Sequence, residues 1–201
     1  TAGGRVIAQA CARDFKPHQL ELGGNNPLVV FADANLDQAA TGIVYGLTNL
    51  NAQWCRALGR VLVHESVKEA LLERVVQQLS VIALGHSLSE HSDMGPLIHQ
   101  QQYDSVLAEV ERLQSIGGRI IQSTALPDLD GYFVAPTLVD GCDPADTVEE
   151  IFGPVATVHS FNRDAQALQL ANGPPYGLAA YGYRGAEQRA STSCRQIPPR
   201  G

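Results

Sequence analysis

Short apolar runs alternate with helix-like segments along most of this chain, and this alternation restricts the possible folds more than any other feature. The runs at 28–31, 60–64 and 154–161 are rich in Val and other apolar residues, as buried strands are. Between them, the segments 66–82 and 101–118 repeat apolar residues at helical spacing. Strands that alternate with helices favour an α/β fold with a largely parallel sheet flanked by helices.

The remaining elements follow the same pattern until the last 20 residues. We expect further helices over 4–13, 36–47 and 163–171, and further strands over 118–121 and 131–139. Ser66 and Glu69 have the spacing of a capping box, and Gly117 has the position of a C-terminal helix cap. The stretch 182–201 is polar and aperiodic and contains Pro-Pro, so we expect an atypical, disordered tail there.

Composition and charge exclude several classes of partner. The chain has 201 residues, of which 44% are hydrophobic and 17% charged, which is typical of a globular protein. Its net charge is −7 and its Lys and Arg residues form no stripe, so neither nucleic acid nor an anionic membrane is an expected partner. No apolar stretch reaches the roughly 18 residues of a membrane span, and residues 1–20 do not have the layout of a signal peptide. We therefore expect a cytoplasmic protein.

The four cysteines argue against a metal site and leave one candidate nucleophile. They are far apart, with no Cys-x-x-Cys pair and no His at ligand spacing, so we expect neither a zinc site nor a disulfide framework. Cys55, in the stretch Asn-Ala-Gln-Trp-Cys-Arg-Ala, has two interpretations. An isolated Cys beside apolar residues is most often a small core residue. At the start of a helix, however, backbone N–H groups would lower its pKa and bind an oxyanion.

Two acidic motifs are equally ambiguous when taken alone. Glu-Leu-Gly-Gly-Asn-Asn-Pro at 21–27 places Glu21 before a glycine pair, where backbone can approach a ligand closely. Glu-Glu-Ile-Phe-Gly-Pro-Val at 149–155 places two acids before a turn that leads into a strand. Each of these is also typical of a plain surface turn with solvated carboxylates.

The order of these motifs is more specific than any one of them. A Glu-Leu-Gly-Gly element, a Gln-x-Cys 32 to 34 residues later and a distant Glu-Glu-Ile-Phe-Gly-Pro resemble the aldehyde dehydrogenase superfamily, from residue 1 to about Tyr181. The resemblance implies a catalytic domain over 21–181. It also implies a remnant of the Rossmann-type cofactor domain over 1–20, and the atypical tail over 182–201 then lies outside the family pattern.

The resemblance also implies roles for individual residues. Cys55 matches the family's nucleophile and Glu21 its general base, while the residues implied to bind NAD or NADP are Gly4, Leu22, Gly23, Glu150 and Phe152, with no metal. In the implied reaction the Cys55 thiolate adds to the carbon of a small aldehyde and hydride leaves for the nicotinamide. Water activated by Glu21 then hydrolyses the thioester to a carboxylic acid.

Departures from the family pattern leave a second hypothesis open. Asn25 stands where many members have Lys, and Ala52 replaces the Gly usually found before the Gln. Members are usually more than twice as long, and they are usually homo-oligomers through a segment that we do not find here. The chain is therefore expected to be an incomplete form of the enzyme with negligible NAD reduction of its own. The alternative is an inactive remnant, a thiol-dependent esterase or an interaction module without cofactor binding.

Overall fold

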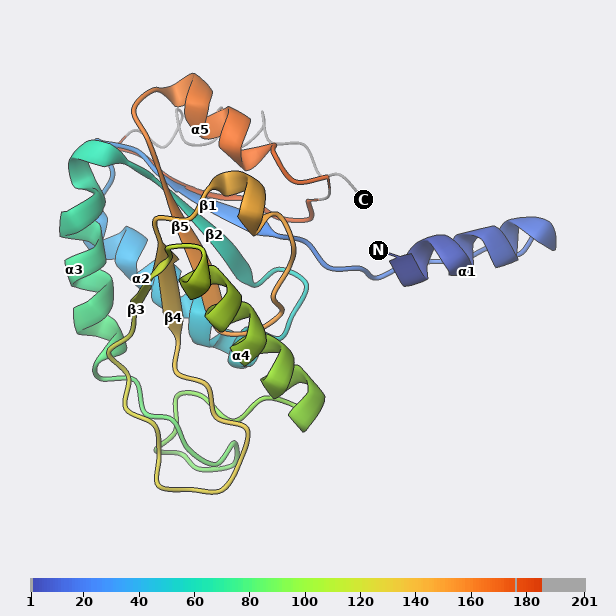
Figure 1. The fold of residues 1–201 in the computed structure, drawn as a ribbon, viewed down its shortest axis with the longest axis horizontal. Coiled ribbons are helices and arrows are strands. Elements are labelled where there is room, and N and C mark those ends of the chain that lie inside the picture. The colour runs from blue at the N-terminus through green and yellow to red at the C-terminus, as the bar shows by residue number, and fades with distance from the viewer. Residues whose placement is uncertain (1, 176, 186–201) are drawn as a thin grey trace.

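The computed structural model describes residues 2–175 and 177–185, which form an α/β fold around one six-stranded sheet (Figure 1). The strand order is β3-β4-β5-β2-β1-β6, and every pairing is parallel except the antiparallel pair β3–β4. The strands are β1 (Asn26–Val30), β2 (Leu58–His64), β3 (Arg119–Ile121), β4 (Thr137–Asp140), β5 (Val155–Phe161) and β6 (Tyr181–Tyr183). The expected fold class, a largely parallel sheet flanked by helices, is confirmed.

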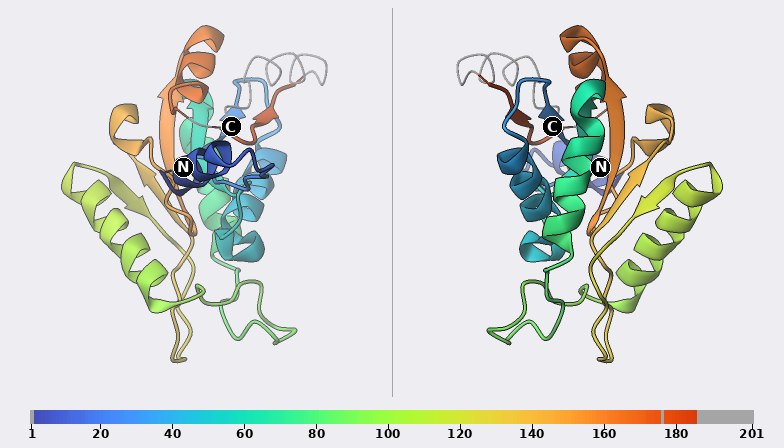
Figure 2. Two further views of the ribbon diagram at one scale, coloured as in Figure 1. Left: turned by 90° about the vertical axis from the view of Figure 1, so that its right-hand side faces the viewer. Right: turned by 90° about the vertical axis from the view of Figure 1, so that its left-hand side faces the viewer.

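Helices cover both faces of this sheet, as the two side views show (Figure 2). The covering helices are α2 (Leu36–Thr48), α3 (Lys68–Leu79), α4 (Gln100–Ser115) and α5 (Asp164–Ala171). The described residues also form helix α1 (Ala2–Arg13) and the 3-10 turns η1 (Asn49–Ala52), η2 (Glu65–Val67) and η3 (Pro144–Thr147). Helices α2 and α3 pack on one face, against alternate strand residues that include Leu28, Val61 and Val158. The intervening residues, such as Val29 and Leu62, face α5, and Val139 and Val155 face α4. This alternation is the two-residue period of strands buried on both faces.

Helix α1 differs from the other helices, because it stands away from the sheet in Figure 1. An extended segment, 16–25, leads from α1 to β1. Gly4 is the buried residue of this helix, and a Cβ added to it would lie 2.8 Å from Leu22 Cδ1. The extended segment therefore packs back along the first turn of the helix. None of the helices in the described part of the chain is long and apolar enough to cross a membrane.

Several expectations about local structure need correction. The expected strand at 131–139 begins only at Thr137, because the preceding residues are loop. The capping box of Ser66 and Glu69 is wrong: the turn η2 precedes α3, and the Ser66 N–H donates to His64 Nδ1. The Gly117 cap is confirmed, with φ +101° and N–H groups of 117 and 118 donating to the carbonyls of Gln114 and Leu113.

The sheet also extends into the expected tail. Gly182 and Tyr183 pair with β1, so the boundary at residue 182 lies too early in the chain. Arg184 continues the ordered chain, and its guanidinium lies 2.7 Å from Asp164 Oδ2 and 4.3 Å from the centre of the Phe31 ring. Residues 186–201, the rest of the expected tail, lie outside the described residues.

Candidate active site

The candidate residues gather at the amino ends of three neighbouring parallel strands. Gly24 lies two residues before β1, Cys55 three residues before β2, and Phe152 three residues before β5. Because β1, β2 and β5 are adjacent and parallel, the segments that precede them meet at one edge of the sheet. Gly24, Ala52, Glu150 and Phe152 line one small hollow at this edge. Sites in open α/β sheets usually lie at the opposite, carboxyl edge.

Asn26 ties the cysteine turn to the glycine pair. Its side chain is fully buried, and Nδ2 donates to the carbonyls of Cys55 at 3.0 Å and Ala57 at 2.8 Å. Its Oδ1 accepts from the Ala179 N–H at 2.9 Å, so the amide connects three segments that are distant in sequence. From the sequence, Asn-Asn-Pro is expected only to form a turn. A polar pair directly before an apolar strand was the available sign of this role.

A run of left-handed backbone precedes Cys55. Leu50, Asn51 and Ala52 have φ between +49° and +55°, which favours glycine or asparagine. Asn51 stabilises the run, since its Oδ1 accepts from the Gly95 N–H at 2.9 Å and its Nδ2 donates to the Pro96 carbonyl at 3.1 Å. Cys55 itself lies in a turn that leads to β2 and is half-buried. The structure therefore does not place this thiol at the start of a helix.

Glu150 lies against the glycine pair. Its Oε1 accepts from the Gly24 N–H at 3.2 Å, and a Cβ at Gly23 would displace the Glu150 carboxylate from this position. Burial raises the pKa of Glu150, and the hydrogen bond from Gly24 opposes this effect in part. Gly23 and Glu150, both expected to bind cofactor, are thus in direct contact.

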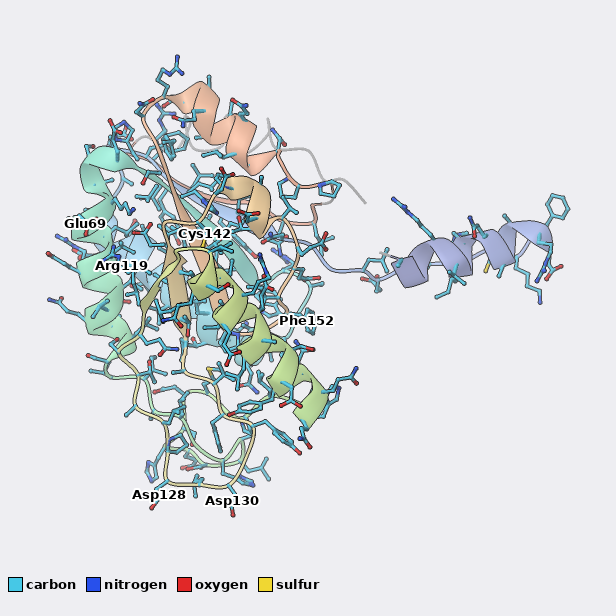
Figure 3. The ribbon with its side chains drawn as sticks, in the orientation of Figure 1. Glu69, Arg119, Asp128, Asp130, Cys142 and Phe152 are labelled. Carbon is cyan, nitrogen blue, oxygen red and sulfur yellow. The ribbon has the colours of Figure 1, made fainter. Side chains whose placement is uncertain are left out.

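Phe152 presents its ring at the surface next to α4 (Figure 3). Its side chain is 37% exposed and its backbone is left-handed, with φ +56°. Gln102 of α4 fixes this strained turn, because its Nε2 donates to the carbonyls of Ile151 at 3.2 Å and Phe152 at 2.9 Å. No local pattern indicates this role for Gln102, because a Gln on a helix surface is common.

Glu21 occupies a different environment from the other candidates. Its carboxylate is exposed and accepts a hydrogen bond from Gln19 Nε2 at 3.0 Å. Among the residues that the structure describes, no hydrogen bond joins Glu21 to Cys55. The structure therefore brings together Gly23, Glu150 and the Cys55 turn, and it places Gly4 against Leu22, the residue before Gly23.

A second hollow, of about 360 Å³, adjoins the residues on either side of Cys55. Trp54 and Arg56 line it, with the Arg56 guanidinium 6.0 Å from the centre of the Trp54 ring. Tyr45 of α2 and Tyr181 of β6 complete an aromatic lining, and Tyr181 Oη donates to the Arg56 carbonyl at 2.8 Å. In the described part of the chain no group of three or more His, Cys, Asp and Glu has a geometry that could hold a metal ion.

Comparison with known proteins connects this arrangement to one family. The family model described as "Aldehyde dehydrogenase family" matches residues 1–198, so the expectation that 182–201 lies outside the family pattern is wrong for most of that segment. The peroxisomal aminoaldehyde dehydrogenase 2 of Malus domestica is 36% identical over 184 residues, which are 90% of this chain and 37% of that protein.

Solved structures give the same result. The NAD-dependent aldehyde dehydrogenase of Sinorhizobium meliloti is 34% identical with a TM-score of 0.91, over 96% of this chain and 39% of that one. The betaine aldehyde dehydrogenase of Staphylococcus aureus, solved in complex with NAD+, is 30% identical with a TM-score of 0.90, over 97% and 40%. The chain thus spans about two fifths of the length of these relatives. With the motif order, the fold and both comparisons in agreement, the chain belongs to the aldehyde dehydrogenase family.

Proposed function

We propose that this chain carries the thiol chemistry of an NAD(P)-dependent oxidation of a small aldehyde to a carboxylic acid. The observation that supports the proposal most is the meeting of the Cys55 turn, the Gly23–Gly24 pair and the Glu150–Gly153 segment at one edge of the sheet. Two of the similar proteins carry NAD in their names or complexes, which supports a nicotinamide cofactor.

The residues at this edge fit the nicotinamide riboside end of such a cofactor. The Glu150 carboxylate suits ribose hydroxyls, which donate hydrogen bonds, and the exposed Phe152 ring offers a flat apolar face. Gly23 allows backbone to approach closely, as its contact with Glu150 already shows. A nicotinamide cofactor held by these residues would supply the hydride acceptor. The fit of Gly4 is weaker, because Leu22 covers it.

The chain's own residues then divide the chemistry between addition and hydrolysis. The Cys55 thiolate adds to the aldehyde carbon, and the Cys55 N–H stabilises the oxyanion that forms. Asn26 fixes the turn that presents the thiol. Glu21 activates the water that hydrolyses the thioester, after its carboxylate leaves Gln19. The aromatic hollow beside Trp54 and Arg56 holds the body of the aldehyde. We also propose a cytoplasmic location.

Thiol reactivity tests this proposal on the 201-residue chain. We expect iodoacetamide to alkylate Cys55 faster than Cys11 or Cys142, and aminoaldehydes to slow alkylation of Cys55 alone. Cys142 is the internal control for a buried thiol, since burial raises its pKa and its Sγ lies 3.6 Å from the Leu113 carbonyl. The measurement is peptide mass spectrometry over time. Equal rates at all three thiols, or no protection by any aldehyde, would remove the case for an activated nucleophile.

A further inference from the structure

One buried histidine lies outside the proposed chemistry. Of the histidines that the structure describes, His159 of β5 is the buried one, with 5% of its surface exposed. It lies on the sheet face between the core under α4 and the core under α5, where the turn η3 covers it (the gold turn between these helices in Figure 1). Its Nε2 lies 2.9 Å from Thr147 Oγ1 and 3.1 Å from Thr157 Oγ1.

Thr147 links this histidine to the candidate site. Its carbonyl accepts from Asn25 Nδ2 at 2.7 Å, and the same nitrogen lies 3.3 Å from the Glu149 carbonyl. Asn25 directly follows Gly24, whose N–H donates to Glu150. The polar contacts thus run from His159 through Thr147 to Asn25. Asn25 is next to Gly24 in the chain and also contacts the residue before Glu150, so it reaches both partners of the Gly24–Glu150 hydrogen bond. Asn25 is also the position at which this chain departs from the Lys of many family members.

We propose that His159 is a positioning residue that holds Thr147 and, through Asn25, fixes the segment presenting Glu150 and Phe152. The proposal rests on the proposed function only in assigning these two side chains to a cofactor. Buried polar networks of this kind set one conformation when every member is satisfied. Replacing one member would release the segment without removing any group from the thiol chemistry.

Burial keeps the His159 ring neutral at neutral pH, although the charges around it act in both directions. Burial lowers the pKa of His159 to about 4, and the Arg60 guanidinium of β2 acts in the same direction. Asp140 at the end of β4, Asp143 before η3 and the Cys142 carbonyl oppose this effect. A neutral ring has one N–H donor and one acceptor nitrogen, so Nε2 and the threonine hydroxyls can pair without a buried charge. Protonation adds a charge that this cluster does not compensate.

Nuclear magnetic resonance of the full chain tests the proposal at pH 7. The variants are Thr147→Val, which keeps the side-chain shape, His159→Val, and His159→Gln, whose amide can still bond Thr147. His91→Val is the matched control at an exposed histidine. We expect the backbone order parameters of residues 149–153 to fall from about 0.85 to below about 0.6 both in His159→Val and in Thr147→Val. His159→Gln should restore most of the order, and the control and α3 should not change. Unchanged order in Thr147→Val, or an equal loss throughout the molecule, would overturn the proposal.

A pH titration adds a readout that a merely structural histidine would not change. In an E150Q background, which removes the neighbouring carboxylate, the side-chain amide signals of Asn25 should shift with a midpoint near that of the His159 ring, about 4. The step should disappear in the E150Q/H159Q protein, and its persistence there would contradict the proposal. Neither measurement uses aldehyde or cofactor, so an unreactive Cys55 would refute the proposed function and leave this result standing.

Discussion

Ala52 has a left-handed backbone at φ +51°, three residues before Cys55 and at a position where the family usually has glycine. Its methyl group is fully buried, so the residue combines a packing gain with backbone strain. The side chain of Asn51 bonds the Gly95 N–H and the Pro96 carbonyl, and these two hydrogen bonds hold the strained run in place. Alanine in place of glycine at position 52 therefore has a structural consequence: the turn that presents the thiol carries backbone strain that glycine would relieve.

This strain predicts different costs for the same substitution at two fully buried alanines. Ala40→Gly, inside α2, should lose about 1 kcal/mol or more of unfolding free energy, from lost burial and backbone entropy. Ala52→Gly loses the same methyl group but gains about 1–2 kcal/mol from relieved left-handed strain, so it should be close to neutral. Urea denaturation measures both free energies. Equal losses at the two positions would show that Ala52 is not strained.

At the scale of elements, one carboxylate joins a helix and two strands. Asp140 at the end of β4 accepts from Lys68 Nζ at 2.6 Å, at the start of α3, and from Arg119 at 2.9 Å, at the start of β3. Burial alone would raise the pKa of Asp140, but the hydrogen bonds from Lys68 and Arg119 outweigh it and lower the pKa. The Asp140 side chain is only 8% exposed, so we expect these bonds to stabilise the fold more than a surface pair does.

Asp140→Asn should therefore destabilise the protein at pH 7 by about 1–3 kcal/mol. Because the folded-state pKa lies below the ordinary value, the stabilisation is present above that ordinary value and is lost as the pH falls through the folded pKa. Wild type and variant should thus converge in acid. The matched control is Asp37→Asn, since the pair of Asp37 and Arg74 is largely exposed. A loss as small as the control's, measured by urea denaturation, would contradict this role.

The elements were largely predictable because each carries a local pattern, whereas the contacts between them were not. Alternation and helical spacing located α2, α3, α4 and β5 within a few residues. The candidate site depends on residues whose role is set by partners far away in the sequence. Asn26, which bonds the Cys55 carbonyl and the Ala179 N–H, is one of them. Motif order located Glu150 and Gly23, but only the fold shows that they touch. A buried histidine such as His159 gives no local sign of burial, because its partner Thr147 lies in a separate turn.

In the molecule as a whole, the candidate site lies at one edge of the sheet. The segments of the candidate site precede the amino ends of β1, β2 and β5, whereas the helices pack on the two faces of the sheet. These segments are loops, and the side-chain amides of Asn26 and Gln102 hold them in place. The polar cluster of His159 fills the sheet face between two apolar cores. Protonation of His159 should therefore lower the free energy of unfolding of the protein.

The pH dependence of stability should show this effect. The folded-state pKa of His159, about 4, lies below the ordinary 6.5, so the unfolded chain binds more protons between these values. The stabilisation is complete above pH 6.5 and declines toward pH 4, by up to about 3 kcal/mol. His159→Gln should lose this decline, while His91→Val should keep it. Parallel curves for wild type and His159→Gln, from urea denaturation at each pH, would contradict it.

In the proposed function, the Cys55 thiolate and the Glu21 carboxylate act on the same carbonyl carbon. A p-nitrophenyl ester tests it most directly, because its acyl group can pass to Cys55 without any cofactor. Intact-mass spectrometry would follow the acyl group on Cys55 as it forms and decays, with Cys55→Ala as the blank. We predict that the acyl group decays at least about tenfold more slowly in Glu21→Gln than in wild type. Equal decay in the two proteins, or acylation that persists in Cys55→Ala, would contradict the account.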